Sequence, residues 1–332
     1  MITSHLGKAG LKISVLGLGT WAFAADGFWG EQDEKNSLAT IRAALDWGIT
    51  LIDSAEAYGA GRSEEIVGRA LQGVREKAVI ATKVSGANLG KTDLIAACER
   101  SLIRLKTDYI DLYQLHWPNL NIPLEETIDA LNRLVEDGKV RNVGCCNFGA
   151  RDLNRAIAEG AGFASNQLPY SLLWRAIEER IMPECAQQKI AVLAYSPLCN
   201  GLLSGKYRSA QDVPAGRTTT RLFSGTRPNS RHGEAGLESE AFDTIAALRA
   251  IGERTAIPMP TLAIGWLLNR PNVASVLVGA RTPRQLEELV HAAEIKLPAG
   301  VETELARATD ALKRRSGDNA DLWEGRDKSR IV

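Results

Sequence analysis

The stretch TLIDSAEAYG, residues 50–59, decides the fold of this chain. An apolar run ends in Asp53, and Tyr58 follows a few positions later. The preceding stretch, DEKNSLATIRAALDWG (33–48), repeats its apolar residues at spacings of three and four, the period of an α-helix. The next apolar run, AVIATK (78–83), again ends in a polar residue, Lys83. Helix and strand patterns therefore alternate, and each of these two strands ends in a polar side chain.

The same alternation continues along the rest of the chain. Runs rich in Val, Ile and Leu are typical of parallel strands buried on both faces, and amphipathic stretches such as 92–106 separate them. The expected strands are 15–21, 50–55, 78–83, 110–116, 140–148, 163–170, 191–198 and 274–280. Eight strand–helix units favour an α/β fold of the (β/α)8 TIM-barrel type, with a doubly wound sheet as the rival.

The remaining segments fit around such a barrel. A short N-terminal β-hairpin is expected, with its turn at 7–10, and an extra C-terminal helix and tail. The tail, 313–332, is expected to lie on the surface or to fray. The one long irregular segment, 199–240, has a length typical of functional lids. No linker interrupts the pattern, so we expect one domain over 1–332.

The charge balance and the lengths of the apolar runs argue against several classes of function. Lys plus Arg and Asp plus Glu both total 40, which disfavours nucleic acid or a membrane surface as partner. The N-terminus has no apolar signal segment, and no run has membrane-spanning length, so a cytoplasmic protein is expected.

The five cysteines indicate neither a zinc site nor a disulfide framework, because their number is odd and no C-x-x-C spacing occurs. Cys145 and Cys146 would point to opposite faces of a strand. Buried thiols are the simpler interpretation of this pair, and a redox switch is the alternative.

Two motifs suggest other chemistry and are rejected. Gly17, Gly19 and Ala22 match a G-x-G-x-x-A dinucleotide fingerprint, but no helix start follows and Ala39 stands where the acidic residue belongs. The four histidines do not pair on one helix face, so a metal site is not expected.

Taken together, several motifs resemble the aldo-keto reductases along nearly the whole chain. GITLIDSAEAYGAGRSEEIVGRAL carries the Asp and Tyr of that family, ATK its Lys and LHWP its His. NQLPYS, AYSPLCNGLLSGKY and VGARTPRQLEE resemble its cofactor-binding segments. The last segment looks closest to a bacterial branch of stress-response and inositol-operon reductases.

The resemblance implies a catalytic tetrad of Asp53, Tyr58, Lys83 and His116. Tyr58 would give its proton to a carbonyl oxygen, and a nearby Lys83 charge would lower the pKa of its phenol, which is ordinarily near 10. Asp53 would neutralise Lys83, and a neutral His116 would orient the substrate. Each residue alone could be an ordinary cap or rim residue, but their position at consecutive strand ends favours catalysis.

The resemblance also implies NADP (NADPH) as cofactor, with NAD less favoured. Its nicotinamide would lie against Thr20, Trp21 and Tyr195, with Asn147 and Gln167 on its carboxamide. Arg281 suits a 2′-phosphate, because a guanidinium matches phosphate oxygens. The expected cofactor contacts are Thr20, Trp21, Asp53, Cys146, Asn147, Gln167, Tyr195, Ser196, Pro197, Leu198, Cys199, Asn200, Gly201, Lys206, Gly279, Arg281, Gln285 and Glu288.

Two positions depart from the family pattern. Cys146 stands where the family has Ser, and a thiol is a weak donor. Leu289 stands where an Asn is usual, which removes an expected hydrogen bond to adenine.

The expected partner is a small carbonyl compound, bound by a monomer or small homo-oligomer. The substrate pocket is expected at Trp21, Trp29, Tyr58, His116 and Trp117. The alternative function is a regulatory subunit of a membrane channel, which the intact tetrad and the short segment before the barrel disfavour.

Overall fold

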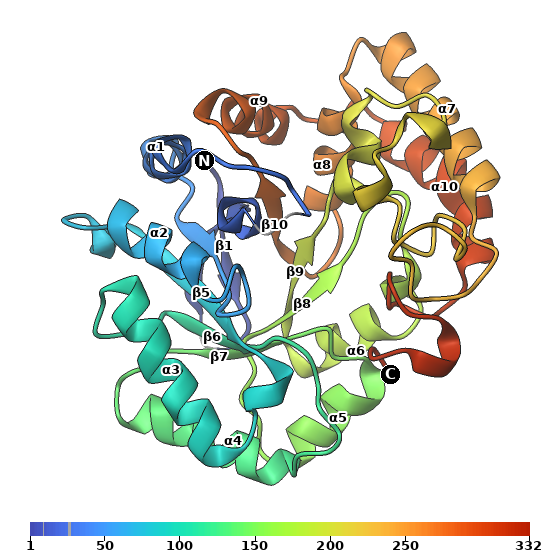
Figure 1. The fold of residues 1–332 in the computed structure, drawn as a ribbon. Coiled ribbons are helices and arrows are strands. Elements are labelled where there is room, and N and C mark those ends of the chain that lie inside the picture. Colours follow the sequence, from blue (N-terminus) through green and yellow to red (C-terminus); the bar gives the residue numbers. More distant parts are fainter. Residues whose placement is uncertain (9, 26–27) are drawn as a thin grey trace.

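A closed parallel barrel forms the centre of the molecule (Figure 1). The computed structural model describes residues 1–8, 10–25 and 28–332. Neighbouring strands follow the order β10-β3-β4-β5-β6-β7-β8-β9 around the barrel. The strands are β3 (Leu16–Gly19), β4 (Leu51–Asp53), β5 (Val79–Val84), β6 (Leu112–Leu115), β7 (Val143–Cys146), β8 (Ser165–Pro169), β9 (Ala191–Tyr195) and β10 (Val273–Gly279). The predicted (β/α)8 barrel is confirmed, and the doubly wound sheet is wrong.

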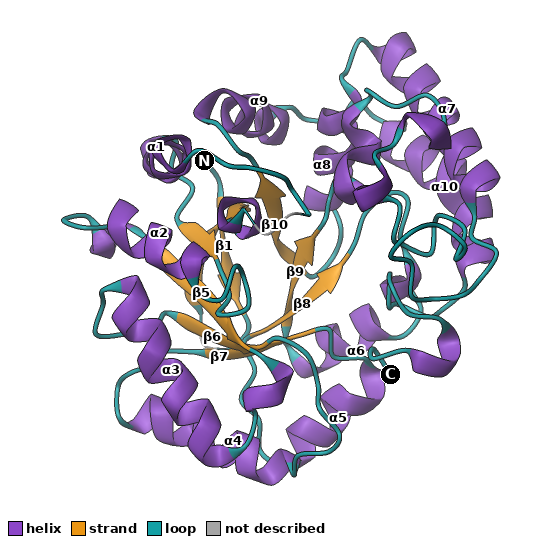
Figure 2. Ribbon diagram, viewed as in Figure 1, coloured by secondary structure: helices purple, strands orange, loops and turns teal. Residues whose placement is uncertain are grey.

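Helices surround this barrel, as Figure 2 shows with helices in purple outside orange strands. Parallel strands need crossover connections, and helices supply them. The α-helices are α1 (Glu34–Asp46), α2 (Arg62–Ala70), α3 (Lys91–Leu105), α4 (Leu124–Glu136), α5 (Ala150–Ala158), α6 (Ile181–Gln188), α7 (Glu238–Thr255), α8 (Met259–Leu268), α9 (Pro283–Glu294) and α10 (Val301–Ser316). Local sequence marks some starts: Asp33 accepts a hydrogen bond from the Lys35 amide, and Thr282 caps α9 just before Pro283.

The N-terminal hairpin covers one end of the barrel. It pairs β1 (Thr3–Leu6) with β2 (Leu11–Ser14). Of the turn predicted at 7–10, Ala9 lies outside the described residues. Leu6 and Ile13 are fully buried in a cluster with Leu51, Leu112 and other side chains of the strands. Because this cluster fills the N-terminal end of the barrel, the carboxyl ends of the strands form its other rim.

The long segment 199–240 is irregular, as expected. It contains only short 3-10 turns, such as Cys199–Ser204 and Ala215–Arg217, before α7 begins. The guanidinium of Arg217 lies over the ring of Trp29, 5.2 Å from its centroid. This contact joins the segment to the loop that follows β3.

The C-terminal tail packs against the barrel instead of fraying. Trp174, in the loop after β8, donates from Nε1 to the carbonyl of Ala320 at 3.0 Å. Within the tail, the buried carboxylate of Asp321 accepts hydrogen bonds from the Trp323 amide at 3.0 Å and from Nε of Arg330 at 2.9 Å. Arg221 donates from Nη1 to the carbonyl of Asn319 at 3.0 Å, which ties the tail to the segment 199–240. The sequence alone shows this tail only as a charged stretch.

In the described part of the chain, no helix is both long enough and apolar enough to cross a membrane.

Candidate active site

The four residues of the expected tetrad meet at one sector of the barrel rim. Asp53 ends β4, Lys83 lies in β5, and His116 directly follows β6. These three strands are neighbours in the barrel. Lys83 Nζ lies 2.7 Å from Oδ2 of Asp53 and 3.2 Å from the phenolic oxygen of Tyr58. The ring centroids of Tyr58 and His116 are 5.8 Å apart in an edge-on arrangement.

The lysine ammonium is shared between the carboxylate and the phenol. It also donates to the backbone carbonyl of Ser54 at 2.8 Å, and its side chain is fully buried. Burial by itself lowers the pKa of Lys83, but the negative charge of Asp53 outweighs it and raises this pKa above its ordinary value. Lys83 is therefore a buried, permanently charged donor.

The phenol of Tyr58 behaves differently from the sequence-based expectation. Burial raises its pKa to about 12, because desolvation of the phenolate outweighs the stabilising charge of Lys83. The charge of Asp53 adds to this rise. The lysine does lower the pKa as predicted, but the net shift is upward, so the phenol holds its proton at neutral pH.

His116 is neutral, as the sequence analysis expects. Burial lowers the pKa of its imidazole to about 3, and the positive charges of Lys83 and Arg330 lower it further. A neutral ring can donate one hydrogen bond and accept another.

The amides expected to hold a carboxamide are close to the tetrad and already hydrogen-bonded. Asn147 accepts from the hydroxyl of Tyr195 at 2.8 Å and donates to the backbone carbonyl of His116 at 3.0 Å. Gln167 donates from Nε2 to Oδ1 of Asp53 at 2.7 Å. The thiol of Cys146 points at Oε1 of Gln167 from 3.8 Å, a weak contact.

Gln114 is a site residue that the sequence analysis misses. It lies opposite Lys83 in the β5–β6 register, is fully buried, and approaches Oδ1 of Asp53 with Nε2 at 3.4 Å. The sequence carries a signal for it: in IDLYQLH, Gln114 and His116 lie on the same face of the strand.

Aromatic rings flank the tetrad on two sides. Trp21 stacks on Tyr58 with centroids 5.8 Å apart and contacts Trp29 edge-on at 5.6 Å. On the other side, Trp117 contacts Trp323 of the tail. Thr20 is buried below this wall and donates to the backbone carbonyl of Asp53 at 2.9 Å. The predicted substrate-pocket residues therefore cluster, and Trp323 is an addition from the tail.

The segment after β9 has features that fit a phosphate group. Cys199, Asn200 and Gly201 have positive φ angles in succession, and Ser196 has one as well. Backbone of this kind presents amide groups to anions. Nδ2 of Asn200 is buried without a hydrogen-bond partner among the described residues. Pro197, Leu198 and Lys206 belong to the same segment. Lys206 is exposed, and its ammonium lies 4.8 Å from the centroid of the Tyr207 ring.

The residues expected at the adenosine end lie on and beside α9. Arg281 donates to Oε1 of Gln32 at 2.8 Å and to the carbonyls of Trp29 and Glu31. Oε1 of Gln285 accepts from the Arg281 amide at 2.9 Å. The remaining two expected contacts, Gly279 and Glu288, are both exposed. Arg281 therefore already bridges to the loop after β3, which the sequence analysis does not anticipate.

The cysteine side chains lie in the interior of the molecule. All five thiols are buried, and burial raises the pKa of each of them. Such thiols are inert, which supports the simpler interpretation of Cys145 and Cys146. Within residues 1–8, 10–25 and 28–332, no group of three or more His, Cys, Asp or Glu could hold a metal ion.

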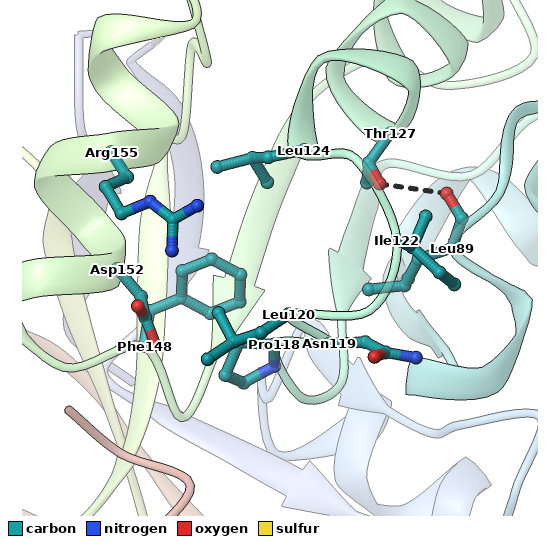
Figure 3. Close-up of a pocket in the computed structure, with 10 residues that line it drawn as sticks. All are labelled: Leu89, Pro118, Asn119, Leu120, Ile122, Leu124, Thr127, Phe148, Asp152 and Arg155. Carbon is teal, nitrogen blue, oxygen red and sulfur yellow. Dashed lines mark hydrogen bonds between the residues drawn. The ribbon is translucent and has the colours of Figure 1, made fainter.

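Two cavities lie away from the tetrad. One, of about 20 Å³, lies between the loop after β6, the start of α4 and α5, and Phe148, Leu120 and Leu124 are among the residues that line it (Figure 3). That volume holds a water but no organic substrate. A larger one, of about 350 Å³, lies beside α6, but its charged side chains are paired: Arg175 with Glu178, and Arg270 with Glu302. The cluster of tetrad residues at the barrel rim is therefore the better candidate for the active site.

Comparison with known proteins finds a matching family model, similar sequences and similar solved structures. A model of the Aldo/keto reductase family matches residues 15–309. The aldo-keto reductase YhdN of Bacillus subtilis (strain 168) is 38% identical over 303 residues, covering 86% of this chain and 87% of the relative. The NADH-specific methylglyoxal reductase of Escherichia coli (strain K12) is 33% identical, covering 93% and 98%. The crystal structure of an aldo-keto reductase from Klebsiella pneumoniae in complex with NADPH has a TM-score of 0.73 at 28% identity, covering 100% of this chain and 99% of that one.

Proposed function

Because the chain belongs to the aldo/keto reductase family, we propose that it transfers hydride between NADPH and the carbonyl of an aldehyde, ketone or sugar. The observation that carries this proposal is the position of Lys83 Nζ, within hydrogen-bond reach of both Asp53 and Tyr58. The phenol is half-buried and lies beside a fully buried ammonium, an arrangement that suits a group that donates its proton as negative charge develops on a partner oxygen.

In this proposal Tyr58 is the general acid for reduction. The high pKa of its phenol keeps the proton in place at neutral pH. As negative charge develops on the substrate oxygen, the phenol donates its proton, and Lys83 stabilises the phenolate that remains. His116, neutral because burial and nearby cations lower its pKa, donates a hydrogen bond to the same oxygen. In the oxidative direction the phenolate takes the proton back.

The bound nicotinamide would supply the hydride. Asn147, Gln167 and Tyr195 would hold its ring, and the segment 196–206 would hold the phosphates. Nδ2 of Asn200, buried without a hydrogen-bond partner in the described part of the chain, and the left-handed backbone beside it support this placement. Arg281 supports a 2′-phosphate and so NADPH. The relative from Escherichia coli is NADH-specific, so NADH is the competitor to test.

The test is oxidation of NADPH and NADH by the purified protein with a panel of aldehydes that includes methylglyoxal. We expect turnover with NADPH by the wild-type protein and a loss of at least about 100-fold in kcat for Tyr58→Phe. A Tyr58→Phe variant as fast as wild type would contradict the mechanism.

The complete tetrad favours turnover over the alternative role as a regulatory channel subunit. That alternative would gain support from negligible turnover together with a stoichiometric membrane partner in a pull-down.

A further inference from the structure

Ser63 closes the loop that carries Tyr58. This loop runs from the end of β4 at Asp53 to the start of α2 at Arg62. Ser63 is the second residue of α2, and its side chain is fully buried. Its backbone amide donates to the carbonyl of Tyr58 at 3.3 Å. Ser63 therefore contacts the main chain of the residue that the proposed function makes the proton donor.

The hydroxyl of Ser63 joins the loop to two strand ends. Its Oγ donates to the carbonyl of Thr20, directly after β3, at 3.0 Å, and accepts from Oγ of Ser54, directly after β4, at 2.9 Å. Oγ1 of Thr20 lies 2.7 Å from the same Oγ atom. These contacts match the one proton and two lone pairs of a hydroxyl. Thr20, Ser54 and Ser63 thus form a hydroxyl cluster, and all three side chains are fully buried.

The hydroxyl cluster is continuous with two neighbours of the phenol. The backbone carbonyl of Ser54 accepts from Nζ of Lys83 at 2.8 Å, and the same Nζ lies 3.2 Å from the phenolic oxygen of Tyr58. Trp21, the residue after Thr20, stacks on the ring of Tyr58. A contact of 3.2 Å is at the upper limit of the usual hydrogen-bond range. A small displacement of the loop would therefore weaken the contact between the ammonium and the phenol.

A separate set of contacts anchors α2 to the rest of the molecule. The buried carboxylate of Glu64, the residue after Ser63, accepts from Nε of Arg104 and from Oγ1 of Thr82, both at 2.6 Å. These contacts join α2 to α3 and β5. Removal of the Ser63 hydroxyl should therefore leave the helix in place and change only the loop before it.

We propose that Ser63 is a positioning residue, whose hydroxyl fixes the Tyr58 loop so that the phenolic oxygen stays within reach of both Lys83 and the substrate oxygen. This inference rests on the proposed function, because it assumes that Tyr58 delivers a proton. Proton transfer needs the donor oxygen at hydrogen-bond distance from its acceptor, and misplacement of a catalytic group by about 1 Å can cost about 100-fold in rate. The Ser63 hydroxyl thus acts on kcat through Tyr58 and leaves cofactor affinity unchanged.

The experiment compares the kinetics and the cofactor binding of serine variants. Steady-state kinetics with NADPH and methylglyoxal give kcat and KM, tryptophan fluorescence gives Kd for NADPH, and thermal unfolding gives Tm. The variants are Ser63→Ala, Ser54→Ala and the double variant with both changes. Ser101→Ala is the matched control, because Ser101 is also a fully buried serine but its Oγ accepts from Nη2 of Arg104 within α3.

We expect Ser63→Ala to lower kcat about tenfold and to leave KM and Kd for NADPH within about twofold of wild type. Ser54→Ala should lower kcat about threefold, since Ser63 keeps its bond to Thr20. The double variant should be no slower than Ser63→Ala, because the Ser54 hydroxyl acts through Ser63. Ser101→Ala should keep the wild-type kcat. Ser63→Ala and Ser101→Ala should each lower Tm by only about 2–4 °C.

The Tyr58→Phe background distinguishes positioning of the phenol from a general structural effect. In single-turnover measurements on Tyr58→Phe, the added change Ser63→Ala should cost less than about twofold, because no phenol remains to be positioned. A tenfold loss in that background would show that Ser63 acts on another group, and it overturns the inference. Weaker NADPH binding with unchanged kcat in Ser63→Ala overturns it as well.

Ser54→Ala keeps the bond between Ser63 and Thr20 and so tests the same inference if Ser63→Ala folds poorly. An unchanged kcat in either of these two variants, once folded, overturns the inference. Wild-type protein that oxidises no NADPH with any aldehyde would instead contradict the proposed function.

Discussion

The indole ring of Trp323 lies nearly parallel to the phenol ring of Tyr195, with centroids 6.1 Å apart and planes 13° apart. Trp323 also contacts Trp117 edge-on at 6.3 Å, and the guanidinium of Arg330 lies 3.7 Å from the centroid of Trp117. The C-terminal tail thus supplies one wall of the barrel mouth beside the tetrad. Asp321 holds this wall through its hydrogen bonds to Trp323 and Arg330.

We expect Trp323→Ala to raise KM for bulky aromatic aldehydes about tenfold and to leave kcat for a small aldehyde nearly unchanged. The indole offers apolar area and ring contacts only to substrates that reach it. Steady-state kinetics with benzaldehyde derivatives and with methylglyoxal measure this difference. Trp323→Phe, which keeps an aromatic ring, should retain most of the affinity. Equal losses on small and bulky substrates would argue against a wall formed by the tail.

We expect Lys83→Met to lower the free energy of unfolding by about 3–5 kcal/mol, because it leaves the buried carboxylate of Asp53 without its ion-pair partner. Asp53→Asn/Lys83→Met should recover most of that loss, since it removes both charges. Neither variant should be active, because the phenolate of Tyr58 loses its cation. Urea denaturation and single-turnover assays measure the two effects. A double variant less stable than Lys83→Met would contradict this account.

Acid should destabilise the protein through His116. Its pKa is about 3 in the folded protein against an ordinary value of 6.5. The unfolded chain therefore takes up a proton first as pH falls below 6.5, and the folded state loses stability between pH 6.5 and 3. From pH 7 to pH 5 this single group should cost about 2 kcal/mol.

His116→Asn removes that titration. Urea unfolding at both pH values, for wild type and variant, isolates the difference, because the other groups contribute equally to both proteins. The variant should lose less stability on acidification. The same loss in both proteins would show that the imidazole is not held neutral by the fold.

We expect Arg281→Met to weaken NADPH binding about tenfold and to leave NADH binding unchanged, because only NADPH carries the phosphate that a guanidinium would hold. Gln32→Met is the matched control: it removes the Oε1 partner of Arg281 but keeps the guanidinium. Fluorescence titration with both cofactors measures the ratio of affinities. Equal losses of affinity for NADPH and NADH would show that Arg281 only anchors the loop after β3.

The barrel and the meeting of the four tetrad residues could be predicted from the chain because both depend on local patterns. Apolar runs and helical periodicity arise from near neighbours in sequence. Once parallel strands are recognised, the ends of consecutive strands must lie at one rim. Asp53 ends one such strand, Lys83 is the last residue but one of the next, and His116 directly follows a third, so their proximity follows from strand order. Their chemical roles come from the family resemblance and stay predictions.

Only the tertiary structure decided the contacts between distant segments. The sequence places Gln167 with the cofactor residues, but its hydrogen bond to Asp53 depends on how eight strands close into one interior. The net rise in the pKa of Tyr58 depends on how completely the surrounding residues exclude water. Trp323 joins the site because the tail is hydrogen-bonded back onto the loop after β8, where Trp174 donates from Nε1 to the carbonyl of Ala320, and because Asp321 accepts from the Trp323 amide within the tail. Periodicity carries no information on such contacts, since each is formed by packing between residues that are far apart in the chain.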